Sequence, residues 1–309
     1  MFDREVFDEA RQEFLSHLRY AKGHRQTTCY AYNSDLGIWA GWLIEAGKDW
    51  QRARAADVEQ FAAWQLRERK VSAAIVNRRL SALSSFYRWA LKHEIVEGDP
   101  VHLADKPKRP LRIPVWLEKE EQAKFEATLK DRRNIPINIF GNHLPRMTAT
   151  RRRYELLFGL LLNSGLRISE ALGLKVADVR LVDGTAKSVR VIGKGNKERI
   201  VPLPEAFGAV FGFWLKDQPR GEFVFAKTPG QKPVSSQAVR AYLRGMLQKA
   251  GIEKRISPHK LRHTYATNLL NAGAELVDIK ALLGHESIAT TQIYTNVGQE
   301  RMEKVVNKL

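Results

Sequence analysis

Four residues near the end of the chain have types and spacings that suit chemistry on a phosphate group. His259 and Arg262 are three positions apart, after a proline that suits the first turn of a helix, so their side chains emerge on one helix face. A histidine can transfer protons, and a neighbouring guanidinium can hold two phosphate oxygens. His285 and Tyr294 follow, nine positions apart. Together these residues predict a phosphoryl-transfer site.

Two further basic residues stand where packing alone does not explain them. Arg167 follows an apolar helix and a glycine, where a charge is costly unless it meets an anion or pairs with a carboxylate such as Glu170. Lys194 lies between two glycines, where a merely solvated lysine is equally common. His285 alone could cap a helix, and Tyr294 alone could be a half-buried aromatic. Only the ordered set favours a catalytic site.

Composition points to a polyanionic partner. The 309-residue chain is long enough for two domains, and its formal net charge is +17, which favours nucleic acid over a membrane. It has no apolar run of 18 residues and no signal-peptide pattern at the N-terminus. Its one cysteine, Cys29, cannot form an internal disulfide and fits a reducing compartment. We therefore expect a cytoplasmic protein that acts on DNA and contacts no membrane.

Residues 1–103 have helical periodicity throughout and predict an N-terminal DNA-binding domain. Asp57 is expected to open one helix. A helix over residues 72–92 has a predicted buried face that includes Ile75 and Leu91. Its opposite face carries Arg78 and Arg79, which we interpret as DNA-facing, with a solvated surface as the equal alternative.

Residues 104–115 form a predicted linker between two domains. Closely spaced prolines remove backbone donors and favour an extended chain. Lys106, Lys108 and Arg109 suggest that this linker lies along a phosphate backbone, the alternative being a plain solvated linker.

Residues 116–309 predict a second domain of helices with a small antiparallel sheet. After a first helix, residues 131–150 are expected to form a long loop, and a helix resumes near Arg152 and breaks at Gly165. From Val179 the pattern alternates, with turns at 183–184 and 193–196 that predict hairpins and place Lys194 at a hairpin tip. Helices then continue to the C-terminus.

Five segments in this order resemble the signature motifs of the tyrosine recombinases, a family that includes phage integrases and Xer enzymes. They are Ser164-Gly165-Leu166-Arg167-Ile168-Ser169-Glu170, Gly193-Lys194-Gly195, His259-Lys260-Leu261-Arg262-His263, Leu283-Gly284-His285 and Tyr294-Thr295. The resemblance covers essentially the whole chain. It implies a SAM-like helical core-binding domain followed by a tyrosine-recombinase catalytic domain.

The resemblance also implies a mechanism. Tyr294 would attack the scissile phosphate and form a 3′-phosphotyrosyl link, which conserves the phosphodiester energy so that rejoining needs no ATP. Arg167 and Arg262 would hold the non-bridging oxygens in the transition state, without a metal ion or another cofactor.

The remaining site residues take their roles from the same resemblance. Lys194 would protonate the departing 5′-oxygen, and His259 would accept the tyrosine proton. His285 would hydrogen-bond the phosphate. Glu170 matches an accessory acidic position that orients a neighbouring side chain, and His263 is interpreted as structural.

A recombinase of this kind acts on double-stranded DNA with inverted half-sites around a short spacer. The resemblance implies a homodimer on each site, a synaptic tetramer and exchange through a Holliday junction. A separate arm-site domain has no room before the first helices, which favours a simple-site, Xer-like enzyme. The tail from about residue 297 would dock on a neighbouring protomer, packing in cis being the alternative. Accessory proteins and the target sequence stay open.

Four other functions would fit parts of this sequence. A type IB topoisomerase shares the tyrosine chemistry but needs no synapsis, and it is the alternative kept open. A metal-dependent nuclease is disfavoured because the histidines are interleaved with Arg and Lys, and no metal-binding motif occurs. A nucleotide-driven enzyme lacks its phosphate-binding loop motif. A DNA-binding protein without catalysis is disfavoured because all six catalytic positions hold competent residues.

Overall fold

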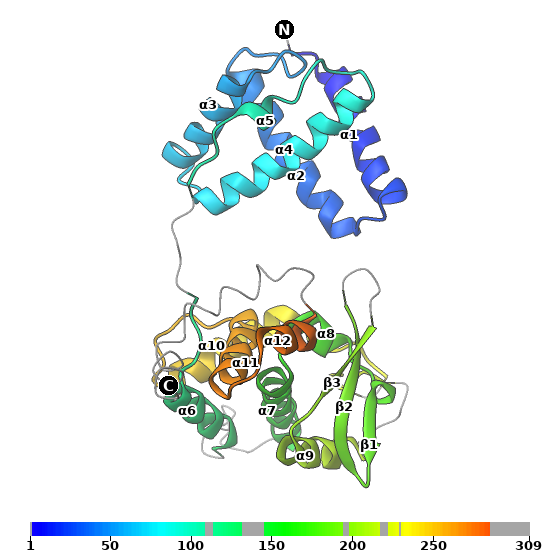
Figure 1. Cartoon of the computed structure of the whole chain (residues 1–309), viewed down its shortest axis with the longest axis vertical. Helices are drawn as coiled ribbons and strands as arrows, with labels where there is room; N and C mark the ends of the chain where they lie inside the picture. The colour runs from blue at the N-terminus through cyan, green and yellow to red at the C-terminus, as the bar shows by residue number, and fades with distance from the viewer. Residues whose placement is uncertain are drawn as a thin grey trace, which may run out of the picture. The chain divides into compact units, whose positions relative to one another are not determined.

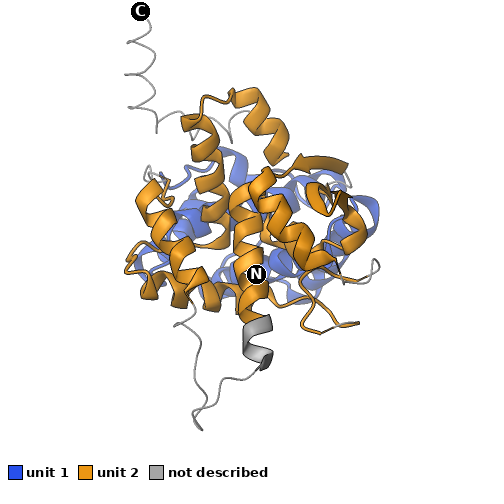
Figure 2. Cartoon of the chain, turned by 90° about the horizontal axis from the view of Figure 1, so that it is seen from below, with its two compact units in different colours: residues 1–112 blue, residues 113–309 orange. Residues whose placement is uncertain are grey.

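The computed structural model describes residues 2–108, 114–131, 145–193, 198–216, 222–228 and 230–284, with the backbone alone at 145–149. The chain divides into two compact units, residues 1–112 and 113–309, which Figure 2 colours separately. The described regular structure is mostly helical, and its strands form one antiparallel sheet in unit 2. This confirms the predicted fold class. No helix in the described ranges has both the length and the apolar character to cross a membrane.

Unit 1 is a helical bundle (Figure 1). Its core is rich in aromatic side chains. Trp39 of α2 is fully buried and donates its indole N–H to the hydroxyl of Tyr87 on α4 at 3.1 Å. That hydroxyl donates in turn to the carbonyl of Trp50 at 2.9 Å. Aromatic side chains bury large areas, so this cluster joins the helices into one core. The helices are α1 (Arg4–Ser16), the π-helical η1 (His17–Ala21), α2 (Gln26–Glu45), α3 (Ala55–Arg67), α4 (Ala73–Lys92) and α5 (Pro100–Leu103).

Two details of unit 1 correct the sequence-based prediction. Ile75 and Leu91 were expected on the buried face of α4, but both are exposed. The buried stripe runs through Val76 and Ala90 instead, and a neighbouring position lies about 100° around the helix. In addition, α3 begins before Asp57, whose carboxylate accepts a hydrogen bond of 2.8 Å from the backbone N–H of the N-cap residue, Arg54.

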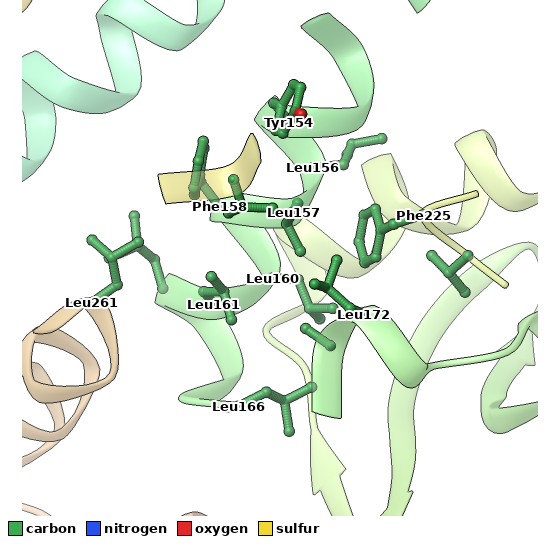
Figure 3. Close-up of a cluster of buried hydrophobic side chains, with 14 of the residues drawn as sticks. Tyr154, Leu156, Leu157, Phe158, Leu160, Leu161, Leu166, Leu172, Phe225 and Leu261 are labelled. Carbon is green, nitrogen blue, oxygen red and sulfur yellow. The ribbon is translucent and has the colours of Figure 1, made fainter. Parts of the chain in front are cut away.

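Unit 2 is built around α7, which is surrounded by other helices (Figure 1). Leu156, Leu157, Leu160 and Leu161 of α7 are almost fully buried and pack in one cluster with side chains such as Leu261 (Figure 3). A helix that is apolar on several sides belongs in the centre of a domain. The helices are α6 (Lys119–Lys130), α7 (Pro145–Ser164), α8 (Ile168–Gly173), the 3-10 turn η3 (Val176–Asp178), α9 (Glu205–Leu215), α10 (Ser236–Lys249), α11 (Pro258–Asn271) and α12 (Leu276–Leu283).

The sheet of unit 2 has the strand order β1-β2-β3, both pairs being antiparallel. Its strands are β1 (Val179–Val182), β2 (Thr185–Ile192) and β3 (Glu198–Pro202). Asp183 and Gly184 both have positive φ, as a tight hairpin turn requires, which confirms the predicted turn. α9 packs so closely on β2 that a Cβ atom added at Gly208 would lie only 2.2 Å from a backbone oxygen of that strand.

The predicted loop over residues 131–150 is wrong in its last part. α7 begins at Pro145, seven positions before Arg152, where the sequence predicted the helix to resume. Proline at the start of a helix loses no hydrogen bond and has a suitable φ, so this proline marks a helix start rather than a break. Residues 132–144 lie outside the described residues.

Candidate active site

Arg167 stands where one helix ends and the next begins. α7 ends at Ser164, Gly165 has a φ of +60°, and Arg167 is the N-cap residue of α8. Glu170 accepts a hydrogen bond from the backbone N–H of Arg167 at 2.9 Å and another from its Nη1 at 2.8 Å. The Arg167 side chain is 37% exposed and that of Glu170 only 6%. A buried carboxylate therefore orients a guanidinium that still reaches solvent.

Arg262 enters the same region from α11. Ser257 is the N-cap residue of that helix. Pro258 occupies its first turn, as the sequence predicted. Arg262 is 1% exposed, and it donates from Nη1 to the carbonyl of Gly165 at 2.8 Å and from Nη2 to the carbonyl of Leu283. A buried guanidinium is stable only when its N–H groups are hydrogen-bonded. These bonds join α11 to the ends of both α7 and α12.

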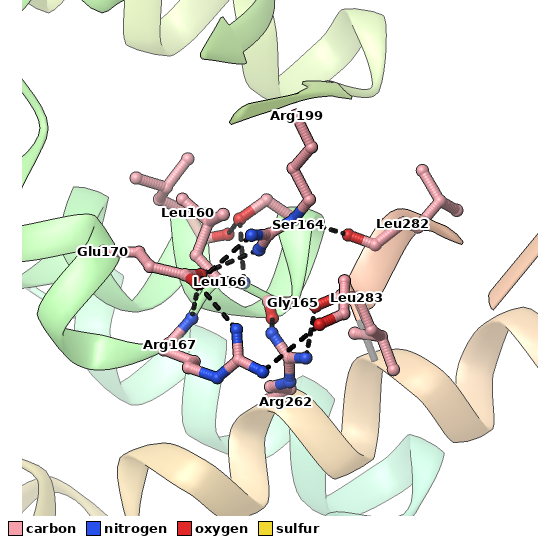
Figure 4. Close-up of polar contacts among 11 residues, drawn as sticks. Leu160, Ser164, Gly165, Leu166, Arg167, Glu170, Arg199, Arg262, Leu282 and Leu283 are labelled. Atoms are coloured by element: carbon pink, nitrogen blue, oxygen red, sulfur yellow. Dashed lines mark hydrogen bonds and ion pairs between the residues drawn. The ribbon is translucent and has the colours of Figure 1, made fainter. Parts of the chain in front are cut away.

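The C-terminal end of α12 is held by three arginines (Figure 4). The carbonyl oxygens of residues 282–284 each accept from a different guanidinium: that of 282 from Arg199 Nε at 3.1 Å, that of 283 from Arg262 Nη2, and that of 284 from Arg167 Nη2 at 3.4 Å. The last carbonyls of a helix lack partners within it and carry its negative pole, so cations are favoured there. Three positive charges thus converge on one point.

Sequence reasoning missed Arg199. Its Nη2 donates to Glu170 Oε2 at 2.8 Å and its Nη1 to Oε1 at 3.2 Å, so Glu170 joins two arginines. Strand alternation was the available signal: Arg199 is two positions before buried Val201, whereas Ile200 between them is exposed. A charged side chain on the inward face of a strand requires an ionic or hydrogen-bonding partner, and for Arg199 this partner is Glu170.

The two arginines set the charge state of Glu170. Burial by itself raises the pKa of a carboxyl group, but hydrogen bonds from Arg199 and Arg167, together with their positive charge, outweigh this and lower the pKa of Glu170 below its ordinary value. The carboxylate is therefore ionised at neutral pH and holds both guanidiniums.

His259 is one helical turn from Arg262, at the surface of the site. Partial burial lowers the pKa of His259, and the positive charges of Arg262 and Arg167 lower it further. Its ring meets that of His263 edge to face, with centroids 4.7 Å apart. Burial, followed by the neighbouring His259, Arg262 and Lys260, lowers the pKa of His263 to about 4. Both rings are thus neutral at pH 7, and a neutral His259 can accept a proton.

Three of the predicted catalytic residues, Lys194, His285 and Tyr294, lie outside the described residues, and so do Arg109 and the tail from about residue 297. Of the predicted set, the structure brings together Arg167, Glu170, His259 and Arg262, from α8 and α11. Within the described ranges, no three His, Cys, Asp or Glu side chains gather in a way that could hold a metal ion.

The predicted DNA-facing arginines of unit 1 share an internal partner. Asp35 on α2 is 2% exposed and accepts hydrogen bonds from both Nη groups of Arg78. Arg79 lies 3.6 Å from the same carboxylate and donates to Gln65 Oε1 at 2.6 Å. Arg78 is 52% exposed but Arg79 only 17%, so Arg78 has the more accessible guanidinium.

The first part of the predicted linker is attached to unit 1. The side-chain amide of Asn77 donates to the carbonyl of Pro107 at 2.8 Å, and the backbone N–H of Asp105 donates to Glu59 Oε1 at 3.0 Å. Lys106 and Lys108 remain exposed. The basic side chains here are therefore free of the core while the backbone is held.

Comparisons with known proteins identify the family. The model of the phage integrase family matches residues 142–301, and that of the phage integrase N-terminal SAM-like domain matches residues 12–94. Tyrosine recombinase XerD of Ralstonia nicotianae is 36% identical, over 95% of this chain and 91% of its own length.

Solved structures agree on the fold. The XerH site-specific recombinase bound to a palindromic difH substrate superposes with a TM-score of 0.74 at 20% identity, covering 98% of this chain and 88% of that one. A lambda integrase dimer bound to a core site gives 0.68 at 18% identity, covering 94% and 97%. The chain therefore belongs to the phage integrase family of tyrosine recombinases, enzymes that cleave and rejoin DNA in site-specific recombination.

Proposed function

We propose that Tyr294 is the nucleophile of this recombinase and that duplex DNA is its substrate. The tyrosine oxygen would attack the scissile phosphorus while the bond from phosphorus to the 5′-oxygen breaks, which leaves a 3′-phosphotyrosyl link and a free 5′-hydroxyl. The proton of Tyr294 would pass to His259, and Lys194 would supply the proton that the 5′-oxygen takes up. Attack by that hydroxyl reverses the step and rejoins DNA without ATP.

Arg167 and Arg262 would bind the non-bridging oxygens of the scissile phosphate. The convergence of these two side chains supports the proposal. Both guanidiniums donate to the last carbonyl oxygens of α12, which carry the partial negative charge of the helix end. The contact from Arg167 is long, at 3.4 Å, and its side chain is partly exposed. A phosphate oxygen carries more charge than a carbonyl and would be the better acceptor for this guanidinium.

The other site residues would complete the charge pattern. Neutral His259 is suited to accept the tyrosine proton, because burial and then the nearby guanidiniums disfavour its charged form. His285 would donate a hydrogen bond to the phosphate. Glu170 is an accessory residue that orients Arg167 and does not react.

Double-stranded DNA would be held by both units. The net charge of +17 suits phosphate contacts, and Arg78, Lys106 and Lys108 offer exposed cations on unit 1. We propose a homodimer on inverted half-sites around a short spacer and a synaptic tetramer of two such dimers, in which the tail from about residue 297 docks on a neighbour. The site of action would be the cytoplasm. The whole-chain relatives are recombinases, which disfavours the type IB topoisomerase alternative.

A trapping experiment tests the assignment of Tyr294. A binding site is first selected from randomised duplexes, and a nick is placed near the scissile phosphate so that the cleaved strand diffuses away. The protein is incubated with this substrate in EDTA, and the products are separated on a denaturing gel. We expect a covalent protein–DNA band whose peptide map contains Tyr294, and no band from Tyr294→Phe, which should still bind the duplex in a gel shift.

The same experiment can contradict the proposal in two ways. A covalent band from Tyr294→Phe would place the nucleophile elsewhere. A band that forms only when Mg²⁺ replaces EDTA would contradict phosphate activation by the arginine pair alone.

A further inference from the structure

Arg199 forms hydrogen bonds to two elements that are distant from it in sequence (Figure 4). It makes a two-point contact with the carboxylate of Glu170 on α8, at 2.8 and 3.2 Å, and donates from Nε to the carbonyl of Leu282 on α12 at 3.1 Å. The side chain of Arg199 is 14% exposed. A buried two-point contact between guanidinium and carboxylate restricts both groups in position and orientation. The beginning of β3 is thus fixed to α8 and α12.

In the sequence, Lys194 falls between the end of β2 at Ile192 and the beginning of β3 at Glu198. Arg199 is opposite Val191 of β2 in the strand register, five positions after Lys194. The adjacent Ile192 and Ile200 are exposed, so apolar packing at these two positions does not hold this end of the hairpin. Among the described residues of β2 and β3, only Arg199 sends side-chain hydrogen bonds to α8 or α12.

Proton donation to a leaving group depends on position. The donor must lie within hydrogen-bond reach of the leaving oxygen, and a displacement of about 1 Å can slow a reaction on the order of 10²-fold. The position of a residue between two paired strands depends on how those strands are held. The contacts of Arg199 hold the beginning of β3 and connect it to the carboxylate that orients Arg167.

We propose that Arg199 is a positioning residue for the general acid: it sets the Lys194 segment relative to the Arg167–Glu170 pair and the end of α12. This inference rests on the proposed function, in which Lys194 gives a proton to the 5′-oxygen as the phosphorus–oxygen bond breaks. Arg199 itself touches neither the phosphate nor the leaving group in this assignment.

The test compares two leaving groups in single-turnover cleavage of the nicked duplex. One substrate has the ordinary 5′-oxygen, and the other has a 5′-bridging sulfur, which leaves as a weakly basic thiolate and needs little protonation. Lys194→Ala and Arg199→Gln are each measured on both. Arg190→Gln is the matched control, because Arg190 lies on β2 and is 49% exposed. It contacts Asp178 at 2.8 Å and Glu198 of β3 at 3.7 Å, but neither α8 nor α12.

We expect Arg199→Gln to cleave the oxygen substrate about 10²-fold more slowly than the original protein, and the sulfur substrate nearly as fast. Arg190→Gln should behave like the original protein on both substrates. The ratio of the two rates is independent of how much of each preparation is folded, so a purely destabilising effect leaves it unchanged.

Two results would overturn the inference, and only one of them would also overturn the general-acid role of Lys194 in the proposed function. If sulfur rescues Lys194→Ala but not Arg199→Gln, then Arg199 acts through Glu170 on the phosphate or on folding, and the proposed function stands. If sulfur fails to rescue Lys194→Ala, the general-acid assignment fails, and this inference fails with it.

Discussion

The guanidinium of Arg262 donates a hydrogen bond of 2.8 Å to the carbonyl oxygen of Gly165, a residue 97 positions earlier in the chain. Two signature motifs are thus joined through a backbone atom whose position depends on a glycine. Gly165 has a φ of +60°, which other residues adopt only with strain. A Cβ atom there would also lie 2.3 Å from Tyr265 Cδ1 and 2.8 Å from Leu283 Cδ2.

Gly165→Ala should therefore lower the free energy of unfolding by about 2–5 kcal/mol, from ~1–2 kcal/mol of backbone strain and ~1–3 kcal/mol of overpacking. It should also abolish cleavage, because the displaced carbonyl moves Arg262. The control is Gly251→Ala, at a φ of +69° with no atom within 4 Å of the added Cβ. Gly251→Ala should lower the free energy of unfolding only by the backbone strain, and the variant should still cleave DNA. Urea unfolding and single-turnover cleavage measure both effects, and equal losses in the two variants would refute the packing argument.

A second prediction concerns acid stability. The pKa of Glu170 is lowered in the folded protein, so its contribution to stability is present above its ordinary value of 4.5 and is lost as the pH falls through the folded value. Glu170→Gln should be less stable than the original protein at pH 7 and should lose less stability on acidification. Urea unfolding at several pH values between 7 and 3 checks this.

Glu205→Gln is the control for that experiment. The pKa of Glu205 is also lowered, by a hydrogen bond from Lys187, but this carboxylate is fully exposed and solvent screens the pair. The stability of Glu205→Gln should follow that of the original protein at every pH. If the two variants have the same pH dependence of stability, then the burial of Glu170 does not increase its contribution to the free energy of unfolding.

The parts of the site that follow from local rules could be predicted from the sequence. Gly165 ends α7, Pro258 begins α11, and the spacing of His259 and Arg262 places both side chains on one face. Each of these depends on neighbours within a few positions, where capping and periodicity are decisive. The recombinase chemistry could be predicted because its motifs are local as well.

The parts that depend on distant contacts could not be predicted. The role of Arg199 arises from partners 29 and 83 positions away, on α8 and α12, which no spacing rule connects to β3. The sequence pattern places Pro145 in a loop, whereas the structure places it at the start of α7, because proline occurs both in turns and in first helical turns. For Lys194, His285 and Tyr294, outside the described residues, the catalytic roles stay predictions.

A third prediction uses His263. Its folded pKa of about 4 lies below the ordinary 6.5, so the unfolded chain binds a proton more readily. The stability that this neutral ring contributes is complete above pH 6.5 and is lost as the pH falls towards about 4. His263→Gln should flatten the loss of stability across that window, measured by urea unfolding. His102→Gln, at an exposed histidine of α5, should leave it unchanged.

The last prediction separates Arg78 from Arg79, two neighbours that both approach buried Asp35. If Arg78 contacts a phosphate, Arg78→Gln should weaken DNA binding and reduce the slope of log K against log salt by about 0.9, the value for one lost phosphate contact. Arg79 is only 17% exposed and hydrogen-bonds Gln65. Arg79→Gln should therefore reduce the stability of unit 1 and leave the salt slope unchanged.

Gel shifts at four salt concentrations and urea unfolding distinguish these outcomes. A reduced slope for Arg79→Gln alone would mean that the more buried guanidinium turns outward to the DNA and that Asp35 holds Arg78 for a structural reason. The expected division of roles has a physical cause. A carboxylate that accepts from both Nη groups of Arg78 fixes the plane of an exposed guanidinium, and less side-chain entropy is then lost when its remaining N–H groups meet a phosphate.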